Sequence, residues 1–533
     1  MKFIYADSQD QIDGNYDFEN EKFSIQAGQK KTRKRNPQLD DLYPHEYYES
    51  IGQKNGHLQP TVNCYHGLLV SRTTIRERYS ETDIQNHTIQ NFLRFPKKTT
   101  RKASPDFPVI VDSGAFKYKD QENPPFDTES TVRFYKLVGC THGVSLDHIP
   151  FQTSQIAKAR SALSKLPRKI ESYHSKNQKL LIKKSKIHAA AGDLKQQPSL
   201  LIYANKADPI REKKRLEADK QLQEICAQVD KVQQNLLVAQ NNIVNLQESI
   251  QQLEAERYRR WKLSIDNAEE FLKCSIQKKA TYVPIATAHG WDDESYHDSA
   301  LHLVEQGYKY IAIGGLVPIA SDTDKIVRVL QAVARATKQK IPLHLFGIKT
   351  INRFDFNLLK KCNVRSFDTA SPLRQAIHDD RSNYWSSDPG GGYVAIRVPQ
   401  IGAKSPSCID KAIKSGFVSK TEAMKQESKC LSMLRSLDTG NSASVEDILR
   451  AVTDYFLMYK DALGSSTRKK MYGELFLSRM KRTLTDRPWQ RCPCKVCQTS
   501  KVEVILHRGS NRNKRRGFHN IWWLGEVVRK SQQ

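Results

Sequence analysis

The 533-residue sequence contains no apolar run of roughly 18 residues, the length that a membrane-spanning helix needs. Its first residues, from Met1 to Asp7, also lack the long apolar core of a signal peptide. We therefore expect no membrane segment and predict a cytoplasmic protein.

The ten cysteines do not form the evenly spaced pattern of a disulfide framework. Seven of them are scattered singly along the chain, and only Cys492, Cys494 and Cys497 lie close together. This distribution is typical of a reducing compartment and one metal site.

Acidic residues are few compared with basic ones: 58 Asp and Glu stand against 85 Lys and Arg, giving a net charge of +27. Such an excess favours a polyanionic partner, most simply a nucleic acid. The chain is long enough for two to four domains, and its 38% hydrophobic content fits a soluble protein with polar extensions. Charge indicates the partner class but no reaction.

Buried-type strands alternate with amphipathic helices and end repeatedly in polar residues. Strands are predicted at 63–70, 108–111, 143–146, 281–287, 308–313, 343–347 and 363–367. This alternation predicts an α/β fold with a parallel sheet, and the recurring polar ends favour a (β/α)8 TIM barrel. Seven strands can be placed and the eighth cannot. Asp112, Asp147 and Asp368 each follow a strand, where such barrels carry catalytic groups.

Residues 151–256 interrupt the alternation with a basic helical segment and then a heptad seam. The seam residues are Leu222, Ile225, Val229, Val232, Leu236, Ala239, Ile243, Val244 or Leu246, Ile250 and Leu253. Steps of three and four predict a coiled coil. It closes either on the preceding helix as an antiparallel hairpin, which we favour, or on a second subunit. The stretch from Arg259 to Leu272 is predicted to be an ordinary barrel helix.

Four regions follow from these patterns. Residues 1–56 are read as a polar arm with a basic cluster from Lys30 to Arg35, and 57–150 with 257–400 as the barrel. Residues 151–256 form the helical insertion. Residues 401–533 are predicted to be a helical region with a zinc-binding subdomain.

The cysteine cluster is the most specific chemical signal. Three thiols within six residues need one further ligand to complete a tetrahedral zinc site. His519 and His507 are the candidates, and His519 is preferred because it opens a terminal helix predicted at 520–529. Four protein ligands leave no open position, so the zinc is structural. Nearby basic residues, expected to contact phosphates, are Arg508, Arg512, Lys514, Arg515 and Arg516.

Several motifs occur together in one order. They are Val111-Asp112-Ser113-Gly114-Ala115-Phe116, Leu146-Asp147, Gly314-Gly315-Leu316, Phe367-Asp368 with Arg374, and Cys492-x-Cys494-x-x-Cys497 with His519-Asn520. With this set the chain resembles the tRNA-guanine transglycosylase (queuine tRNA-ribosyltransferase) family over 57–150, 257–400 and 486–533.

The resemblance implies a zinc-containing barrel that exchanges a base in a nucleic acid. It assigns Asp368 as the nucleophile that forms a covalent glycosyl ester, and Asp112 as the acid/base group. Asp147 would read the edge of the base, since an ionised carboxylate accepts N–H donors. The other implied substrate-binding residues are Ser113, Phe116, Gly314, Gly315 and Leu316, and Arg374 is expected to bind the nucleic acid.

Two departures from the family pattern concern the base. Gly114-Ala115-Phe116-Lys117 stands where the family usually has Gly-Gly-Phe-Gln, and Ala288 stands at a usual glutamine. The lost amide removes a directional contact, which leaves the incoming base open. His289 is a neighbour that offers a substitute, although such a histidine is more often a simple loop residue.

Other residues resemble the DNA-modifying (DpdA-type) branch, namely Asp147-His148-Ile149-Pro150 and Arg259-Arg260-Trp261. That branch implies exchange of guanine in DNA for a 7-deazaguanine such as 7-cyano-7-deazaguanine. The alternatives are the same exchange on tRNA, or a catalytically inactive barrel subunit that binds nucleic acid. A DNA-opening partner protein and a homodimer are further expectations.

Overall fold

The computed structural model describes residues 1–6, 11–24, 41–48, 50–54, 57–61, 64–94, 107–150, 152–196, 209–320, 322–349, 355–389, 391–403, 406–440, 443–462 and 474–531. The chain divides into two compact units. The barrel unit comprises Met1–Ile149 and Leu263–Gln533, and the hairpin unit comprises Pro150–Lys262.

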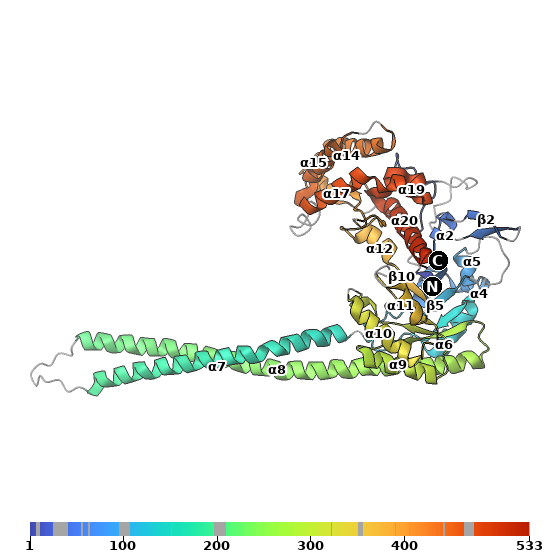
Figure 1. Ribbon diagram of the computed structural model, residues 1–533. Coiled ribbons are helices and arrows are strands. Elements are labelled where there is room, and N and C mark those ends of the chain that lie inside the picture. The colour runs from blue at the N-terminus through green and yellow to red at the C-terminus, as the bar shows by residue number, and fades with distance from the viewer. Residues whose placement is uncertain are drawn as a thin grey trace, which may run out of the picture. The chain divides into compact units, whose positions relative to one another are not determined.

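Eight parallel strands close into a barrel, which confirms the predicted TIM-barrel class (Figure 1). Around the barrel they are β1 (Lys2–Ala6), β4 (Gly67–Ser71), β5 (Val109–Asp112), β6 (His142–Val144), β7 (Val283–Ala288), β8 (Ile311–Ile313), β9 (Leu343–Leu345) and β10 (Val364–Thr369). Because all strands run in one direction, their carboxyl ends share one rim.

The eighth strand is β1, at the very beginning of the chain. It pairs in parallel with β10 on one side and with β4 on the other, and Phe3, Ile4 and Tyr5 are fully buried. The prediction of a polar arm over 1–56 is therefore wrong for its first residues. Five residues beside a polar stretch are too few to show a period. The basic cluster from Lys30 to Arg35 lies outside the described residues.

One layer of the barrel interior consists of apolar side chains from six strands. They are Ile4, Leu69, Ile110, Val144, Ile285 and Ala312. Interior packing of this kind makes the barrel a solid core with its chemistry at one rim.

Helices surround the barrel on the outside. They include α3 (Arg72–Arg78), α4 (Glu81–Asn86), α5 (Ile89–Phe92), α6 (Thr128–Val138), α9 (Asp293–Glu305), α10 (Thr323–Ala336), α11 (Phe356–Lys361) and α12 (Ser371–His378). α10 buries seven residues on one face, as an amphipathic helix against a sheet should.

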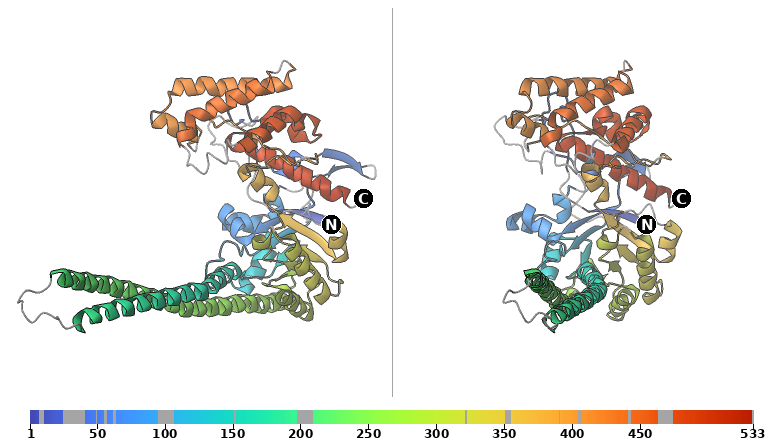
Figure 2. Two further views of the ribbon diagram at one scale, coloured as in Figure 1. Left: turned by 60° about the vertical axis from the view of Figure 1, so that its left-hand side comes forward. Right: turned by 90° about the vertical axis from the view of Figure 1, so that its left-hand side faces the viewer.

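The carboxyl-terminal part of the barrel unit is helical, as predicted (Figure 2). Its helices are α13 (Cys408–Lys414), α14 (Lys420–Arg435), α15 (Val445–Tyr459), α17 (Glu474–Asp486), α18 (Pro488–Arg491), α19 (Lys495–Ser500) and α20 (Gly509–Lys530). α20 packs closely on α12, since a Cβ atom on Gly517 would lie 2.2 Å from the Leu373 side chain. Smaller elements are α2 (Pro44–Tyr47), the β2 (Ser50–Lys54) and β3 (His57–Thr61) hairpin, and the β11 (Ile396–Arg397) and β12 (Leu506–His507) pair.

The hairpin unit consists of two long helices that lie side by side, α7 (Thr153–Gln196) and the first part of α8 (Pro209–Gln277) (Figure 1). They are antiparallel, since Arg160 early in α7 pairs with Glu254 late in α8. The favoured intramolecular hairpin is thus confirmed. The stretch predicted as a barrel helix, Arg259 to Leu272, is helical, but it is part of α8, which continues without a break to Gln277.

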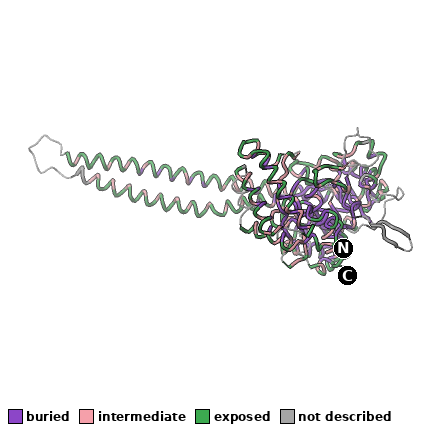
Figure 3. Tube along the Cα trace, turned by 90° about the horizontal axis from the view of Figure 1, so that it is seen from above, coloured by how far each residue is buried: buried purple, intermediate pink, exposed green. Residues whose placement is uncertain are grey.

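The predicted seam of α8 is the face that the hairpin buries. Ile225, Val229, Val232, Leu236, Ala239 and Ile250 are buried, whereas Val244 is 51% exposed and Leu246 occupies the seam in its place. α7 carries a matching seam of half-buried residues that the sequence reading missed: Ala159, Leu163, Leu166, Ile170, Tyr173, Asn177, Leu180, Lys184, Ile187 and Ala191. Most other residues of the two helices are exposed (Figure 3).

A search of the described helices for a segment long and apolar enough to cross a membrane finds none.

Candidate active site and metal cluster

Three carboxylates lie at the carboxyl-end rim of the barrel. Asp112 is the last residue of β5, Asp147 follows β6, and Asp368 is the fifth residue of β10. Asp147 is 8% exposed and Asp368 is 5% exposed. Buried carboxylates at this rim are typical of catalytic groups, because the loops that follow the strands enclose them.

Asp368 is held by one of its two oxygens. Its Oδ1 accepts a hydrogen bond from the N–H of Gly347 at 3.0 Å, and Nε2 of His344 lies 3.3 Å from the same oxygen. Oδ2 makes no hydrogen bond with any described residue. A fixed carboxylate with one bare oxygen suits nucleophilic attack.

A chain of polar side chains inside the barrel supports His344. Its Nδ1 lies 2.7 Å from the hydroxyl of Ser366, which in turn lies 2.5 Å from the hydroxyl of Tyr310. Ser366 and Asp368 are two residues apart on β10 and therefore point to the same side of the strand. The sequence reading did not identify these three residues. The i, i+2 spacing of Ser366 and Asp368 was the only available signal.

Asp147 uses both oxygens. Oδ1 accepts from the hydroxyl of Ser113 at 3.1 Å, and Oδ2 lies 2.8 Å from Nε2 of His289. Tyr118 completes the group, since its hydroxyl donates to the Asp147 carbonyl at 2.9 Å and lies 2.6 Å from that of Ser113. His289 is thus a constituent of the site, which its place beside Ala288 did not reveal. Tyr118 is a further residue that the sequence reading missed.

Asp112 is the proton-handling candidate. Its burial raises the pKa of the carboxyl to about 7, and the neighbouring charges of Asp147 and Asp368 act in the same direction. The side chain of Ser71 and the N–H of Gly114 oppose the shift. Oδ1 is buried and has no hydrogen-bond partner among the described residues. A carboxyl with a pKa near neutrality can both give and take a proton.

Gly314 and Gly315 follow β8, and both positions need glycine for packing. A Cβ atom on Gly314 would lie 2.4 Å from Cε1 of His289, and one on Gly315 would lie 2.8 Å from the Tyr296 hydroxyl. Gly315 also has a φ of +72°. Leu316 is buried, and Phe116 is 51% exposed. The substrate contacts expected of these residues stay predictions.

The predicted metal ligands come together. The Sγ atoms of Cys492, Cys494 and Cys497 lie 3.5, 3.5 and 3.4 Å from Nδ1 of His519. All four ligand atoms lie within 4.8 Å of one another. Tetrahedral zinc, with Zn–S near 2.3 Å and Zn–N near 2.0 Å, places such atoms about 3.5 Å apart. The donor set and its spacing therefore fit zinc.

The surroundings of His519 orient it for this role. Its Nε2 lies 2.8 Å from the carbonyl oxygen of Trp385, an interaction that leaves Nδ1 as the free electron pair. The ring of Tyr384 stacks on the imidazole with centroids 3.8 Å apart. His507, the alternative ligand, is engaged elsewhere, because its Nε2 lies 3.0 Å from the carbonyl oxygen of Ile377. His519 lies within α20 instead of opening a helix.

The predicted phosphate patch is wrong for its four arginines, each at most 4% exposed. Arg512, Arg515 and Arg516 are at most 2% exposed and belong to α20, which begins at Gly509. Arg516 donates to the carbonyl oxygens of Ala376, Val504 and Leu506, and Arg515 donates to those of Asp13 and Gly14. Their guanidinium groups therefore form hydrogen bonds inside the protein. A run of basic residues in the sequence looks the same whether it is buried in this way or lies in a solvated loop.

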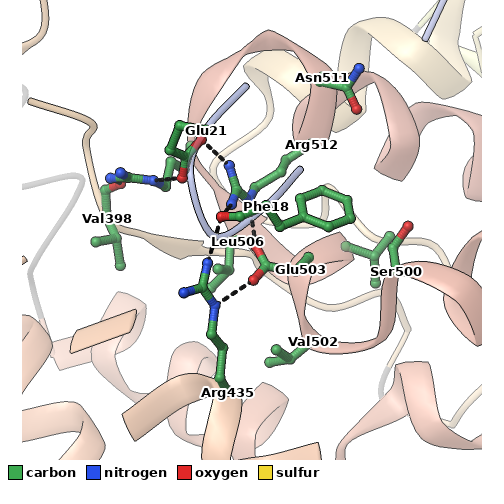
Figure 4. A network of polar contacts seen from close by, with 12 residues as sticks. Phe18, Glu21, Val398, Arg435, Ser500, Val502, Glu503, Leu506, Asn511 and Arg512 are labelled. Atoms are coloured by element: carbon green, nitrogen blue, oxygen red, sulfur yellow. Dashed lines mark hydrogen bonds and ion pairs between the residues drawn. The ribbon is translucent and has the colours of Figure 1, made fainter. Parts of the chain in front are cut away.

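Arg512 belongs to a buried ion-pair network (Figure 4). It pairs with Glu21 at 2.6 Å and with Glu503 at 2.5 Å, and Glu503 also accepts from Arg435 at 2.7 Å. Arg508, the remaining arginine of the patch, pairs with Glu21 and with Glu427. The network therefore ties the N-terminal segment to α20. Arg374 is exposed and Lys514 is half-buried, so their contacts with nucleic acid stay predictions.

Comparison with known proteins finds a similarity over nearly the whole chain. The chain is 27% identical over 531 residues to a DNA-guanine transglycosylase of Salmonella montevideo, covering 98% of this chain and 95% of that protein. The similarity therefore includes the 151–256 segment. No family model matches the chain.

Proposed function

We propose that the chain belongs to the tRNA-guanine transglycosylase family, is of the DNA-modifying branch, and exchanges guanine in DNA for a 7-deazaguanine base, such as 7-cyano-7-deazaguanine. The observation that carries the proposal is the grouping of Asp112, Asp147 and Asp368 at one barrel rim. The similarity to a DNA-guanine transglycosylase supports DNA as the polymer.

Asp368 is the nucleophile. Its bare Oδ2 attacks C1′ of the target deoxyguanosine, a C1′–O bond forms, and the C1′–N9 bond breaks with its electron pair leaving on guanine. The N–H of Gly347 and the ring of His344 hold Oδ1, which fixes the direction of Oδ2. A carboxylate in fixed orientation loses little freedom on reaction, and this lowers the barrier.

Asp112 handles the protons of both half-reactions. In its acid form it donates a proton to the departing guanine and becomes a carboxylate. It then takes the N9 proton of the incoming base, whose nitrogen attacks C1′ and displaces Asp368. The proton count balances over one cycle, and a pKa of about 7 makes both transfers accessible near neutral pH.

Asp147 recognises the base edge. Ser113 and His289 each occupy one lone pair of its carboxylate, and the remaining lone pairs accept N–H donors of a guanine-like ring. Gly314, Gly315, Leu316 and Phe116 are proposed to complete the base site. His289 is committed to Asp147 and does not replace the amide lost at Ala288. The incoming base is therefore recognised with one directional contact fewer.

Zinc bound by Cys492, Cys494, Cys497 and His519 is proposed to be structural. All four positions of a tetrahedral ion are taken by protein ligands, so none is open to substrate. When bound, the ion fixes α20 to the cysteine loop. The ring of Tyr384 stacks on His519, and Nε2 of His519 lies 2.8 Å from the carbonyl oxygen of Trp385. These contacts position the segment of Tyr384 and Trp385 beside the cysteine loop.

The target nucleotide must leave the stack of a duplex before Asp368 can reach C1′. A partner protein that opens DNA is therefore expected to assist. Arg374 on α12 is exposed, and with Lys514 it is proposed to contact backbone phosphates.

Trapping of a protein–nucleic acid adduct tests the covalent step. The full-length protein is incubated with guanine-containing DNA, or with tRNA, and run on a denaturing gel. We expect an adduct with DNA that is absent from Asp368→Ala. An adduct that survives in Asp368→Ala would contradict the nucleophile, and an adduct with tRNA alone would contradict DNA as substrate.

Analysis of nucleosides from cells with and without the protein tests the product. A 7-deazaguanine deoxynucleoside is expected to disappear from DNA when the protein is removed. Loss of a tRNA nucleoside alone would assign the exchange to tRNA. Absence of any change, together with no adduct, would favour an inactive binding subunit.

A further inference from the structure

Seven lysines of α7 lie on one stripe of the helix surface. With Leu163 and Leu166 at heptad positions a and d, they fall only at positions c and g, which are neighbours on the helix circumference. They are Lys158, Lys165, Lys169, Lys176, Lys179, Lys183 and Lys186, and all are exposed. We name this set the lysine stripe. Its sector is about 50° wide, and its length is about 42 Å at 1.5 Å per residue.

The stripe is not neutralised within the protein. None of its lysines forms an ion pair with a described residue, and between Lys158 and Lys186 the only acidic residue of α7 is Glu171, on another face. Side chains of Lys169 and Tyr173 do approach, with the ammonium 5.9 Å from the ring centre. The charges of the stripe are thus available to a partner.

The second helix forms no ion pair with the stripe among the described residues, although Glu217 lines a pocket together with Lys183 and Lys186. Arg160 and Glu254, both at position e, pair across one edge of the seam. In an antiparallel pair the g positions then meet at the other edge, beside the stripe. The g residues of α8 there are all uncharged: Gln228, Asn235, Asn242 and Ser249. Exposed lysines of α8, such as Lys220 and Lys231, instead have acidic sequence neighbours.

A polyphosphate backbone fits this stripe better than other anionic surfaces. Apolar residues that insert into a bilayer are absent from positions c and g, which otherwise hold Ser172, Ala162 and Ala190. A straight row of unpaired ammonium groups matches the regular row of phosphates along stiff double-stranded DNA.

We propose that the lysine stripe of α7 is a second nucleic-acid surface, which binds the phosphate backbone of duplex DNA. The stripe includes no residue of the barrel rim. Because it contacts phosphates alone, its binding does not depend on the sequence of the DNA. The choice of DNA rests on the proposed function. The stripe increases affinity for DNA of any sequence, whereas the rim residues act on the target nucleotide.

Removal of charge from the stripe tests the proposal. The full-length variant Lys169→Gln, Lys176→Gln and Lys183→Gln is compared with a control, Lys220→Gln, Lys231→Gln and Lys273→Gln, which removes three exposed lysines from α8. Glutamine keeps a helix propensity close to that of lysine. The probe is a labelled duplex made only of A·T pairs, so its binding is independent of base exchange. Circular dichroism checks that both variants fold.

We expect the stripe variant to bind the duplex at least about tenfold more weakly near 0.1 M salt, with the control close to wild type. The slope of log affinity against log salt should fall by about 3, one for each lost phosphate contact. Equal affinities and slopes for the two variants would overturn the proposal. So would a stripe variant that loses binding to phosphatidylserine vesicles but keeps duplex binding. Neither outcome bears on the adduct formed by Asp368.

Discussion

Nε2 of His289 lies 2.8 Å from Oδ2 of Asp147, so a loop residue after β7 orients the carboxylate after β6 that we propose to read the base. Both side chains are buried, and Gly314 leaves the space that the imidazole occupies. The proposed base site is thus formed by residues that follow three neighbouring strands, β6, β7 and β8. His289 acts through Asp147 and is a positioning residue.

Substitution of His289 by alanine tests this role. A hydrogen bond to a charged group is worth roughly 1.5–3 kcal/mol, so kcat/KM for exchange of labelled guanine should fall about 10- to 100-fold. The loss should appear chiefly in KM for the free base, because the proposed covalent step is assigned to Asp368. His297, half-buried on α9, provides the control, and His297→Ala should retain activity. An equal loss in both variants would remove His289 from the site.

The pH dependence of the first half-reaction should report Asp112. Release of guanine needs its acid form, so adduct formation should slow as pH rises through about 7. Capture of the incoming base needs the carboxylate and should slow as pH falls below that value. Single-turnover rates of the two steps, measured separately from pH 5.5 to 8.5, should show these opposite limbs. Parallel profiles would assign the proton transfers to another group.

Asp112 should also cost stability at high pH. The pKa of the Asp112 carboxyl is raised from 3.8 to about 7 in the folded protein. Between these two values the folded protein keeps a proton that the unfolded chain has released. The free energy of unfolding therefore falls as pH rises from about 4 to about 7. Asp112→Asn should therefore be more stable than wild type at pH 8, by about 1 kcal/mol or more, with the difference vanishing near pH 4. Thermal unfolding across this range measures it. A constant difference at all pH values would contradict the linkage.

Substitution of a proposed zinc ligand should affect metal content far more than substitution of His507, the alternative histidine. Cys494→Ser and His519→Ala should lose the metal and unfold at lower temperature, because the ion joins the cysteine loop to α20. His507→Ala should retain one zinc per chain. Metal analysis of purified protein gives the stoichiometry, and full zinc in His519→Ala would reopen the choice of ligand.

The sequence was informative where residues were locally patterned. Asp112 and Asp368 could be placed because apolar runs precede them, and the three cysteines because their spacing is tight. β1 was not predicted because no local pattern marks it. Its five residues form a strand only through their pairing with β4 and β10. The seam of α7 was hidden by Asn177 and Lys184, polar residues at apolar positions.

Long-range partners account for the rest. Arg512 is 491 residues from Glu21, and nothing local in the sequence distinguishes a buried arginine from a solvated one. His344 and Tyr310 likewise become parts of the site only because β8, β9 and β10 are adjacent in the barrel. Their roles depend on which strands become neighbours when the sheet closes. A pattern of strands in the sequence indicates a closed sheet but does not give these pairings.

Replacement of Arg512 by alanine should separate structural from nucleic-acid-binding arginines. It removes one partner from each of half-buried Glu21 and buried Glu503, which keep one arginine each, so unfolding should become easier by about 3 kcal/mol. Arg374→Ala, on the exposed side of α12, should change stability by less than about 0.5 kcal/mol and weaken DNA binding instead. Denaturant unfolding and duplex binding are measured for both variants. A stable Arg512→Ala protein with weakened DNA binding would restore the phosphate role that its burial argues against.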